Sequence, residues 1–255
     1  MQIDHLTVHA TALQREILLD VYYKGPSPRV LLLMNDGQDL TTWPAVFPEG
    51  LCAVGIHAGP MRRQEYGVAG IPDYQGLGGM AAAYSDFVVE ELLPFLQEQY
   101  PGLSEARRAF AGFSLGGLSA LDIVWQHPQL FSMAGVFSGA LWWRDRPLGE
   151  DYSDEHDRIM HRRIRESNYR PGLQFFFECG TSDETADRNH NGIIDSIDDT
   201  RDLILELMKK GYKVPEDIHY LEIPGGRHDM ATWQMALDIF LRLPFFTASV
   251  QVDKR

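Results

Sequence analysis

The sequence predicts an α/β protein: a mostly parallel central sheet with helices on both faces, preceded by an N-terminal antiparallel hairpin. Three observations indicate this fold. The chain begins with two stretches of alternating polarity, continues with apolar runs typical of strands buried on both sides, and places segments of helical periodicity between those runs. Alternating strands and helices favour parallel pairing. No repeat or linker divides the 255 residues, so we expect a single domain over 1–255.

The elements follow in chain order. Gln2–Ala10 and Arg15–Tyr23 alternate apolar and polar residues, as a hairpin with one solvated face does. Six further strands are expected from apolar runs: Arg29–Met34, Leu51–His57, Ala106–Phe113, Phe131–Ser138, Leu173–Cys179 and Ile218–Ile223. The predicted helices are Met80–Tyr100, bent or broken at Pro94, then Leu115–Gln126, a charged and exposed Asp154–Ser167, Asp199–Lys210 closed by Gly211, and Met230–Leu243.

Composition excludes several functions. The formal net charge of -13 should repel nucleic acid and anionic membrane surfaces. No apolar run approaches the roughly 18 residues of a membrane span. The first residues show no basic and apolar leader pattern, so a cytoplasmic location is expected. Cys52 and Cys179 lie in apolar, strand-like runs and are expected to be buried free thiols.

A strand, a sharp turn and a helix meet at Gly112-Phe113-Ser114-Leu115-Gly116. In this context a G-x-S-x-G motif is typical of a nucleophile elbow. The turn holds the serine in strained backbone angles, and a Cβ atom at Gly112 or Gly116 would collide with the crossing chain. Ser114 is therefore the candidate nucleophile.

The run from Gly112 to Gly117 resembles the putative-esterase branch of the α/β-hydrolases, which includes esterase D, enterochelin esterases, feruloyl esterase domains and mycolyltransferases. The resemblance implies an α/β-hydrolase fold and a serine esterase that works through an acyl-enzyme, with a small-molecule ester substrate and no organic cofactor. Esters of carbohydrates, phenolic acids and siderophore lactones are all used within the family. An acyltransferase and a calcium-stabilised binding module on the same scaffold are the alternatives.

A serine nucleophile needs a base and a group that orients the base, and hydrolases of this fold place the acid and then the histidine after the serine. His228 follows the last predicted strand in a turn similar to the family's Gly-Gly-x-His, and Trp233 matches its downstream tryptophan. Asp183 follows the preceding strand in a Gly-x-x-Asp turn similar to the family's, and is the expected acid. The adjacent Glu184 is the alternative.

The oxyanion of acyl transfer needs two backbone N–H donors. One is expected from Leu115, and the other from Gln38, in a loop that resembles the family's strand ending in Asp-Gly-Gln. The neighbouring Asp36, Gly37 and Asp39 are alternatives for the second donor, and a plain Asn-Asp-Gly turn is the alternative for the loop. The segment Arg62–Tyr66 resembles a family Arg-x-x-Glu-Tyr loop, whose charges we expect to brace the loop. Trp142 and Trp143 follow a strand end and are candidates to line the substrate pocket, with a packing role as the alternative.

One segment departs from the family pattern and has the spacing of an EF-hand calcium loop, similar to dockerin-type loops. Its candidate ligands are Asp187, Asn189, Asn191, the carbonyl of Ile193, Asp195 and Asp198. The twelfth position is Asp instead of Glu, and no clear helix precedes the loop. We predict a structural calcium ion that fixes the turn carrying Asp183. The alternative is an Asx-rich turn in which Asp199 or Thr200 caps the next helix.

Overall fold

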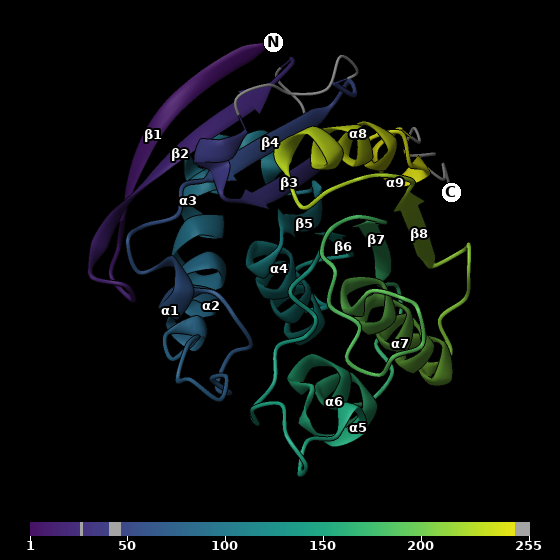
Figure 1. Cartoon of the computed structure of the whole chain (residues 1–255). Coiled ribbons are helices and arrows are strands. Elements are labelled where there is room, and N and C mark those ends of the chain that lie inside the picture. Colours follow the sequence, from purple (N-terminus) through teal and green to yellow (C-terminus); the bar gives the residue numbers. More distant parts are fainter. Residues whose placement is uncertain (26–27, 41–46, 248–255) are drawn as a thin grey trace.

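An eight-stranded sheet runs through the part of the chain that the computed structural model describes, which is residues 1–25, 28–40 and 47–247 (Figure 1). The strand order is β1-β2-β4-β3-β5-β6-β7-β8. Their bounds are β1 Gln2–Ala10, β2 Arg15–Tyr23, β3 Val30–Asn35, β4 Leu51–Ile56, β5 Arg107–Phe113, β6 Met133–Phe137, β7 Gln174–Gly180 and β8 Ile218–Ile223. The pairs β1–β2 and β2–β4 are antiparallel, and the pairs from β4 to β8 are parallel. The predicted hairpin and parallel sheet are confirmed.

Helices cover both faces of the sheet (Figure 1). On one side lie α2 Ala81–Asp86, the π-helical η2 Phe87–Leu92, α3 Leu93–Gln99, α4 Leu115–Gln126, α6 Ile159–Glu166 and α7 Asp195–Lys210. On the other lie α8 Met230–Phe240 and α9 Pro244–Thr247. The short elements are η1 Gly37–Asp39, α1 Arg62–Glu65, η3 Pro101–Leu103 and α5 Asp154–Asp157.

Side-chain alternation along the strands divides the interior into two cores. Phe175 and Phe177 of β7 belong to the core that contains Leu203 of α7, whereas Phe176 belongs to the core that contains Phe240 of α8. Successive residues of a strand point to opposite faces, so a continuous apolar run is required where both faces are covered. The carboxyl ends of the parallel strands then form one edge, at which loops can gather functional side chains.

The helix was predicted to be bent or broken at Pro94, and it is distorted near this residue but not broken. Helical residues run from Ala81 to Gln99, with Pro94 as the second residue of α3. The turns directly before it are π-helical, a wider spacing that accommodates a residue without a backbone N–H.

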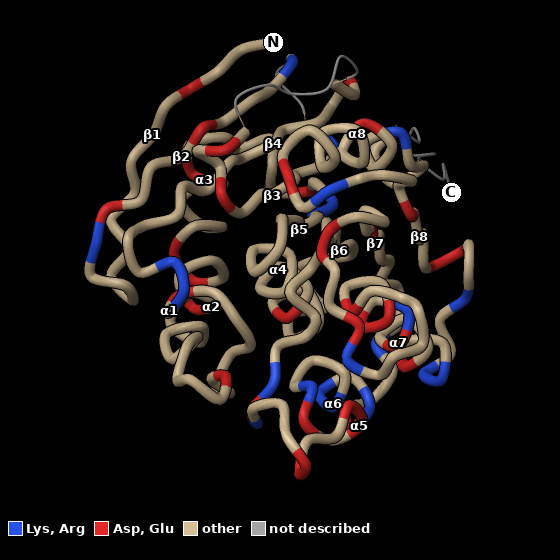
Figure 2. The backbone as a smooth tube through the Cα atoms, in the orientation of Figure 1, with Lys and Arg blue, Asp and Glu red and all other residues tan. Residues whose placement is uncertain are grey.

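The segment predicted as one charged, exposed helix is two helices and is partly buried. Arg158 has extended backbone angles, φ −75° and ψ 109°, and separates α5 from α6. Its buried guanidinium pairs with Asp199 at 2.7 Å and Asp202 at 2.6 Å, both on α7. Figure 2 shows acidic and basic residues side by side on α5, α6 and α7. The prediction was wrong because these charges bind α7 across the interface and are not simply solvated.

Two further expectations concern burial and membranes. Cys52 and Cys179 are free and buried, as predicted. Among the described residues, every helix is too short or too polar to cross a bilayer. The cytoplasmic location stays a prediction.

Candidate active site

The turn between β5 and α4 holds Ser114 at φ 52° and ψ −122°, angles that a residue with a side chain rarely adopts. Its backbone is fixed from several sides. The Ser114 N–H donates to the carbonyl of Phe137 at 2.9 Å, and the Ser114 carbonyl accepts from the N–H of Ala140 at 3.0 Å. These hydrogen bonds to the end of β6 and the loop that follows it therefore stabilise the strained backbone of Ser114.

The two motif glycines lie where the chain crosses itself. A Cβ atom on Gly112 would come within 2.5 Å of the Gly116 carbonyl carbon, and one on Gly116 would come within 2.7 Å of an Asp36 carboxylate oxygen. The Asn35 amide group donates to the Gly116 carbonyl at 2.7 Å, which ties the end of β3 to the elbow. These contacts give the physical reason for glycine at both positions.

The predicted oxyanion donors belong to two segments that meet at this elbow. Leu115 is the first residue of α4, and Gln38 lies in η1 directly after β3. The Gln38 side-chain oxygen accepts from the Ala58 N–H at 2.9 Å. Among the described residues, neither the Gln38 N–H nor the Leu115 N–H has a hydrogen-bond acceptor, so both are free to bind an oxyanion.

Arg62 braces the loop that carries Gln38. Its guanidinium makes a bidentate contact with Asp36, at 2.6 and 2.8 Å, and Asp36 occupies the left-handed region with φ 60°. Asp36 lies between the elbow and Arg62, since its carboxylate is the group nearest to Gly116. The expected bracing role of the Arg62–Tyr66 segment is consistent with this geometry. Desolvation lowers the pKa of His228, and the positive charge of Arg62 adds to that shift, so Arg62 lies near the imidazole.

The turn after β7 and the loop after β8 are joined by main-chain and side-chain hydrogen bonds. The Thr181 N–H donates to the Ile223 carbonyl at 3.0 Å, the Ser182 N–H to the Gly226 carbonyl at 2.8 Å, and the Gly225 N–H to the Thr181 hydroxyl at 2.8 Å. These bonds bring the turn of Asp183 against the loop of His228.

Asp183 is better placed than Glu184 to face the histidine. One oxygen of Asp183 accepts from the Gly180 N–H at 3.1 Å, while Oδ1 is buried and has no donor among the described residues. Burial raises the pKa of Asp183, and His228 opposes that shift by its positive charge. Glu184 instead accepts from the Ser196 N–H at 2.7 Å, in the first turn of α7. The geometry therefore favours Asp183, and it assigns Glu184 to the helix terminus.

A pocket of about 260 Å³ opens at this edge of the sheet. Its lining includes Asp183, His228, Ser138, Gly139 and Trp142. Ser114 is not one of the lining residues, but its carbonyl accepts from Ala140, which directly follows Gly139 of the pocket wall. His228 has no hydrogen bond to Ser114 or to Asp183 among the described residues. Catalytic hydrogen bonds are commonly long or misaligned without substrate and tighten in the complex.

The two tryptophans differ in position. Trp142 is 38% exposed and lines the pocket. Trp143 is only 1% exposed and packs against Gly67 and Gly78, so it is a packing residue and not part of the pocket wall. Trp142 thus has the position expected of a pocket residue, its role toward substrate stays a prediction, and Trp143 has the packing position given as the alternative.

Two residues at this site were missed by sequence reasoning. Ser138, which follows β6, has φ 43° and accepts a hydrogen bond from the Trp233 indole at 2.9 Å. Glu178 lies within β7, 1% exposed, between phenylalanines and Cys179. A charged residue inside an otherwise apolar buried run was a readable signal for Glu178, and position at a strand's carboxyl end was one for Ser138.

The candidate calcium loop brings most of its predicted side chains together. Asp187 accepts from the backbone N–H groups of Asn191 and Gly192, at 3.1 and 2.9 Å. The amide groups of Asn189 and Asn191 donate to Asp198, at 2.9 and 2.6 Å. Asp198, at the twelfth loop position, therefore lies next to Asn189 and Asn191 at the third and fifth.

Other features of this loop differ from the predicted calcium loop. Asp195 accepts from the Arg188 N–H at 2.9 Å and faces that arginine, and the Ile193 N–H donates to Asn191 at 2.8 Å. Helix α7 begins at Asp195, earlier than expected, so Asp199 and Thr200 are buried inside the helix and cap nothing. No three His, Cys, Asp or Glu side chains converge as a metal site anywhere in the described ranges. Calcium binding stays a prediction.

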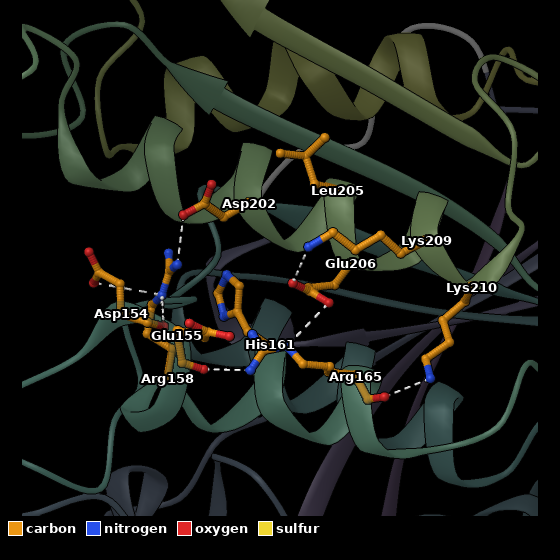
Figure 3. A pocket seen from close by; sticks show the side chains of 10 residues that line it. All are labelled: Asp154, Glu155, Arg158, His161, Arg165, Asp202, Leu205, Glu206, Lys209 and Lys210. Atoms are coloured by element: carbon orange, nitrogen blue, oxygen red, sulfur yellow. Dashed lines mark hydrogen bonds and ion pairs between the residues drawn. The ribbon is translucent and has the colours of Figure 1, made fainter.

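A second pocket, of about 560 Å³, lies between α5–α6 and α7 and shares no lining residue with the first (Figure 3). Its walls carry as many acidic as basic side chains, and these form pairs such as Lys209 with Glu206 at 2.9 Å. Arg158 and Asp202 form another pair across it. Because the charges compensate one another, this pocket favours no charged ligand.

Comparison with known proteins agrees with the elbow and the fold. The model of the family described as Putative esterase matches residues 49–242, most of the chain. The chain belongs to this esterase family. The siderophore triacetylfusarinine C esterase of Aspergillus fumigatus is 38% identical over 68 residues, which cover 27% of this chain and 23% of that protein. The siderophore enterobactin esterase of Emericella nidulans is 32% identical over 83 residues, which cover 32% and 27%.

Among solved structures, enterochelin esterase from Shigella flexneri superimposes with a TM-score of 0.71 at 19% identity. The match covers 96% of this chain and 59% of that one. At this identity the likeness establishes the fold, and this chain has the α/β-hydrolase fold. The matches span about a quarter of the length of the two curated relatives.

Proposed function

We propose that this member of the esterase family is a serine esterase that hydrolyses a carboxylic ester through an acyl-enzyme. The observation that carries the proposal is the strained Ser114 elbow at the same sheet edge as the bonded turn and loop of Asp183 and His228. A half-buried serine in such angles, at the same sheet edge as an imidazole and a half-buried carboxylate, is typical of a nucleophile elbow.

The chemistry follows from the groups present. The His228 imidazole takes the Ser114 hydroxyl proton as the oxygen attacks the ester carbonyl, and then returns that proton to the departing alcohol. Asp183 orients the imidazole and stabilises its protonated form, for which Oδ1 is the free acceptor. The N–H groups of Leu115 and Gln38 bind the negative oxygen of each tetrahedral intermediate. Water, activated by His228, then releases the acid from Ser114.

The substrate proposal rests on the relatives and on the pocket. Both curated relatives are named as siderophore esterases. A pocket of about 260 Å³ that Trp142 partly walls would admit one arm of a larger ester, with an aromatic or planar acyl group against the indole. We therefore propose a siderophore-type ester, and carbohydrate and feruloyl esters are the competing substrates.

We also propose that the loop 187–198 binds calcium and thereby steadies the turn of Asp183. The support is the convergence of Asp187, Asn189, Asn191 and Asp198, together with the contact from Glu184 to the first turn of α7 that links the loop to the acid turn.

Turnover of p-nitrophenyl acetate by the wild-type chain and Ser114→Ala tests the esterase proposal. We expect a loss on the order of 10⁶ in kcat for the variant, with an unchanged melting temperature. Equal rates for the two would contradict it and would favour a binding module. A panel of siderophore lactone, feruloyl and acetyl-sugar esters, assayed with and without an added alcohol acceptor, then separates the substrates and distinguishes hydrolysis from acyl transfer.

A further inference from the structure

Glu178 is an unusual residue for the interior of a sheet. It is 1% exposed, and neither oxygen of its carboxyl group has a hydrogen-bond donor among the described residues. A buried carboxylate without a donor is costly, whereas a buried carboxylic acid carries no charge and brings its own donor. The position therefore favours the protonated form.

The surroundings of Glu178 belong to the esterase site. Its backbone carbonyl accepts from the Ser138 N–H at 2.8 Å. The Ser138 hydroxyl already accepts from the Trp233 indole, so its own proton is free to point at a carboxyl group. Asp183 is the second carboxyl near it, and one of its oxygens also has no donor. Burial raises the pKa of both carboxyl groups and the Ser138 hydroxyl opposes that shift in each, so this one hydroxyl lies near both groups.

One proton, bound to either carboxyl group, would remove the repulsion between two neighbouring negative charges. Burial raises the pKa of both groups, but Asp183 has the Gly180 N–H and the positive charge of His228 to stabilise a negative charge, whereas Glu178 has Ser138 and, among the described residues, no positive charge near it. Burial, and then the charge of Asp183, raise the pKa of Glu178 to about 8. The proton therefore belongs on Glu178 at neutral pH.

We propose that Glu178 is a positioning residue of the esterase site: a protonated carboxyl group that donates a hydrogen bond toward the unpartnered Oδ1 of Asp183, beside the Ser138 hydroxyl, and keeps Asp183 charged and directed at His228. This rests on the proposed serine esterase function. Glu178 acts through Asp183 and does not touch substrate.

The groups that face Glu178 come from every neighbouring element. Ser138 follows β6, and Asp183 lies in the turn after β7. On β8 the residue paired with Glu178 is the apolar Leu221. From α8, the Trp233 indole donates to the Ser138 hydroxyl and so acts on Glu178 only through Ser138. Among the described residues, Asp183 is the charged group whose field acts on Glu178, while His228 and Asp229 act on Asp183.

The pH dependence of kcat/KM tests the proposal. In the wild type, ionisation of Glu178 places two negative charges side by side, so activity should fall on the alkaline side with an apparent pKa near 8. Glu178→Gln keeps a neutral donor, so it should retain the rate at pH 7 to within about threefold and move the alkaline limb upward. Its acid limb should not move, because Glu178 carries no charge there. Glu178→Met removes the donor and should lower kcat about tenfold.

Two results would overturn the proposal. If Glu178 were ionised at neutral pH, Glu178→Gln would remove a negative charge near the imidazole and shift the acid limb to lower pH. A Glu178→Met variant that kept both the wild-type melting temperature and the wild-type kcat would show that the carboxyl group of Glu178 does not position Asp183.

Infrared spectroscopy gives a readout that does not depend on catalysis. In the Ser114→Ala background we expect a carboxylic-acid C=O band at pH 6 that disappears on titration to pH 10 and is missing from Glu178→Gln. Glu222→Gln is the matched control, since Glu222 is ion-paired with Arg201 at 2.7 Å and should contribute no such band. Absence of the band from Ser114→Ala would refute the proposal for Glu178, whereas a Ser114→Ala variant as active as wild type would refute the esterase function instead.

Discussion

The Trp233 indole donates a hydrogen bond to the Ser138 hydroxyl over 2.9 Å. The same ring stacks on Phe113, which precedes the nucleophile, with centroids 5.0 Å apart, and meets the His228 ring edge-on at 5.0 Å. One side chain of α8 therefore contacts the strand leading to Ser114, the imidazole of His228 and the hydroxyl of Ser138, which lies near Glu178 and Asp183. The first prediction concerns this ring.

Trp233→Phe should keep the stacking and lose the hydrogen bond to Ser138. We expect a destabilisation of about 1 kcal/mol in urea unfolding and a fall in kcat of about three- to tenfold, because Ser138 is no longer held toward Asp183. Trp143→Phe is the matched control, since the Trp143 indole N–H is buried without an acceptor and loses no bond. A larger loss of kcat in Trp143→Phe than in Trp233→Phe would contradict this role.

The oxyanion loop should depend on the pair between Arg62 and Asp36. Asp36→Asn keeps a residue that tolerates the left-handed backbone but removes the ionic contact. Since the loop positions the Gln38 N–H, we expect kcat to fall about 10- to 100-fold with little change in KM. Exposed Arg63, changed to Gln, serves as the control. A purely KM effect of Asp36→Asn would show that the pair binds substrate instead.

The acid limb of the pH profile should lie below pH 6.5. Desolvation lowers the pKa of His228 from its ordinary 6.5, an effect that Asp183 partly opposes. A general base works only when neutral, so activity is present above this pKa and is lost as pH falls through it. Asp183→Asn removes the charge that raises the pKa of His228, so the limb of its residual activity should move to still lower pH. A limb above 7 in the wild type would contradict the assignment.

Calcium removal should weaken the acid turn if the loop 187–198 binds the ion. We expect added calcium to raise the melting temperature and a chelator to reverse the effect. At a free calcium concentration of 100 times the dissociation constant, binding should add about 2.7 kcal/mol to the free energy of unfolding. Asp187→Ala combined with Asp198→Ala should abolish the response, and exposed Asp151→Ala should keep it. Identical melting curves and activities of the wild type with calcium and with chelator would argue for a plain Asx turn.

Much of the fold could be predicted from local patterns. The apolar runs around Leu31, Val54 and Phe176 fix strands because both faces are covered, and the elbow at Ser114 has a sequence signature. The order of the strands and the family resemblance then placed Asp183 and His228 at one edge.

The remaining features depend on contacts between distant segments. Arg158 interrupts a helical pattern because it is buried against α7, and Trp143 is buried because two glycines make room for it. The relation of Glu178 to Ser138 and Asp183 arises only when β6 and β7 pair. No local periodicity encodes such contacts, so they become apparent only in the three-dimensional structure.

The central claim is that Ser114 carries the acyl group, and active-site labelling tests it most directly. Mass spectrometry of the chain after reaction with a fluorophosphonate should show one added group, on the peptide containing Ser114, with loss of esterase activity in proportion to labelling. His228→Ala should label far more slowly. Labelling on another residue, or undiminished hydrolysis by fully labelled protein, would contradict the account.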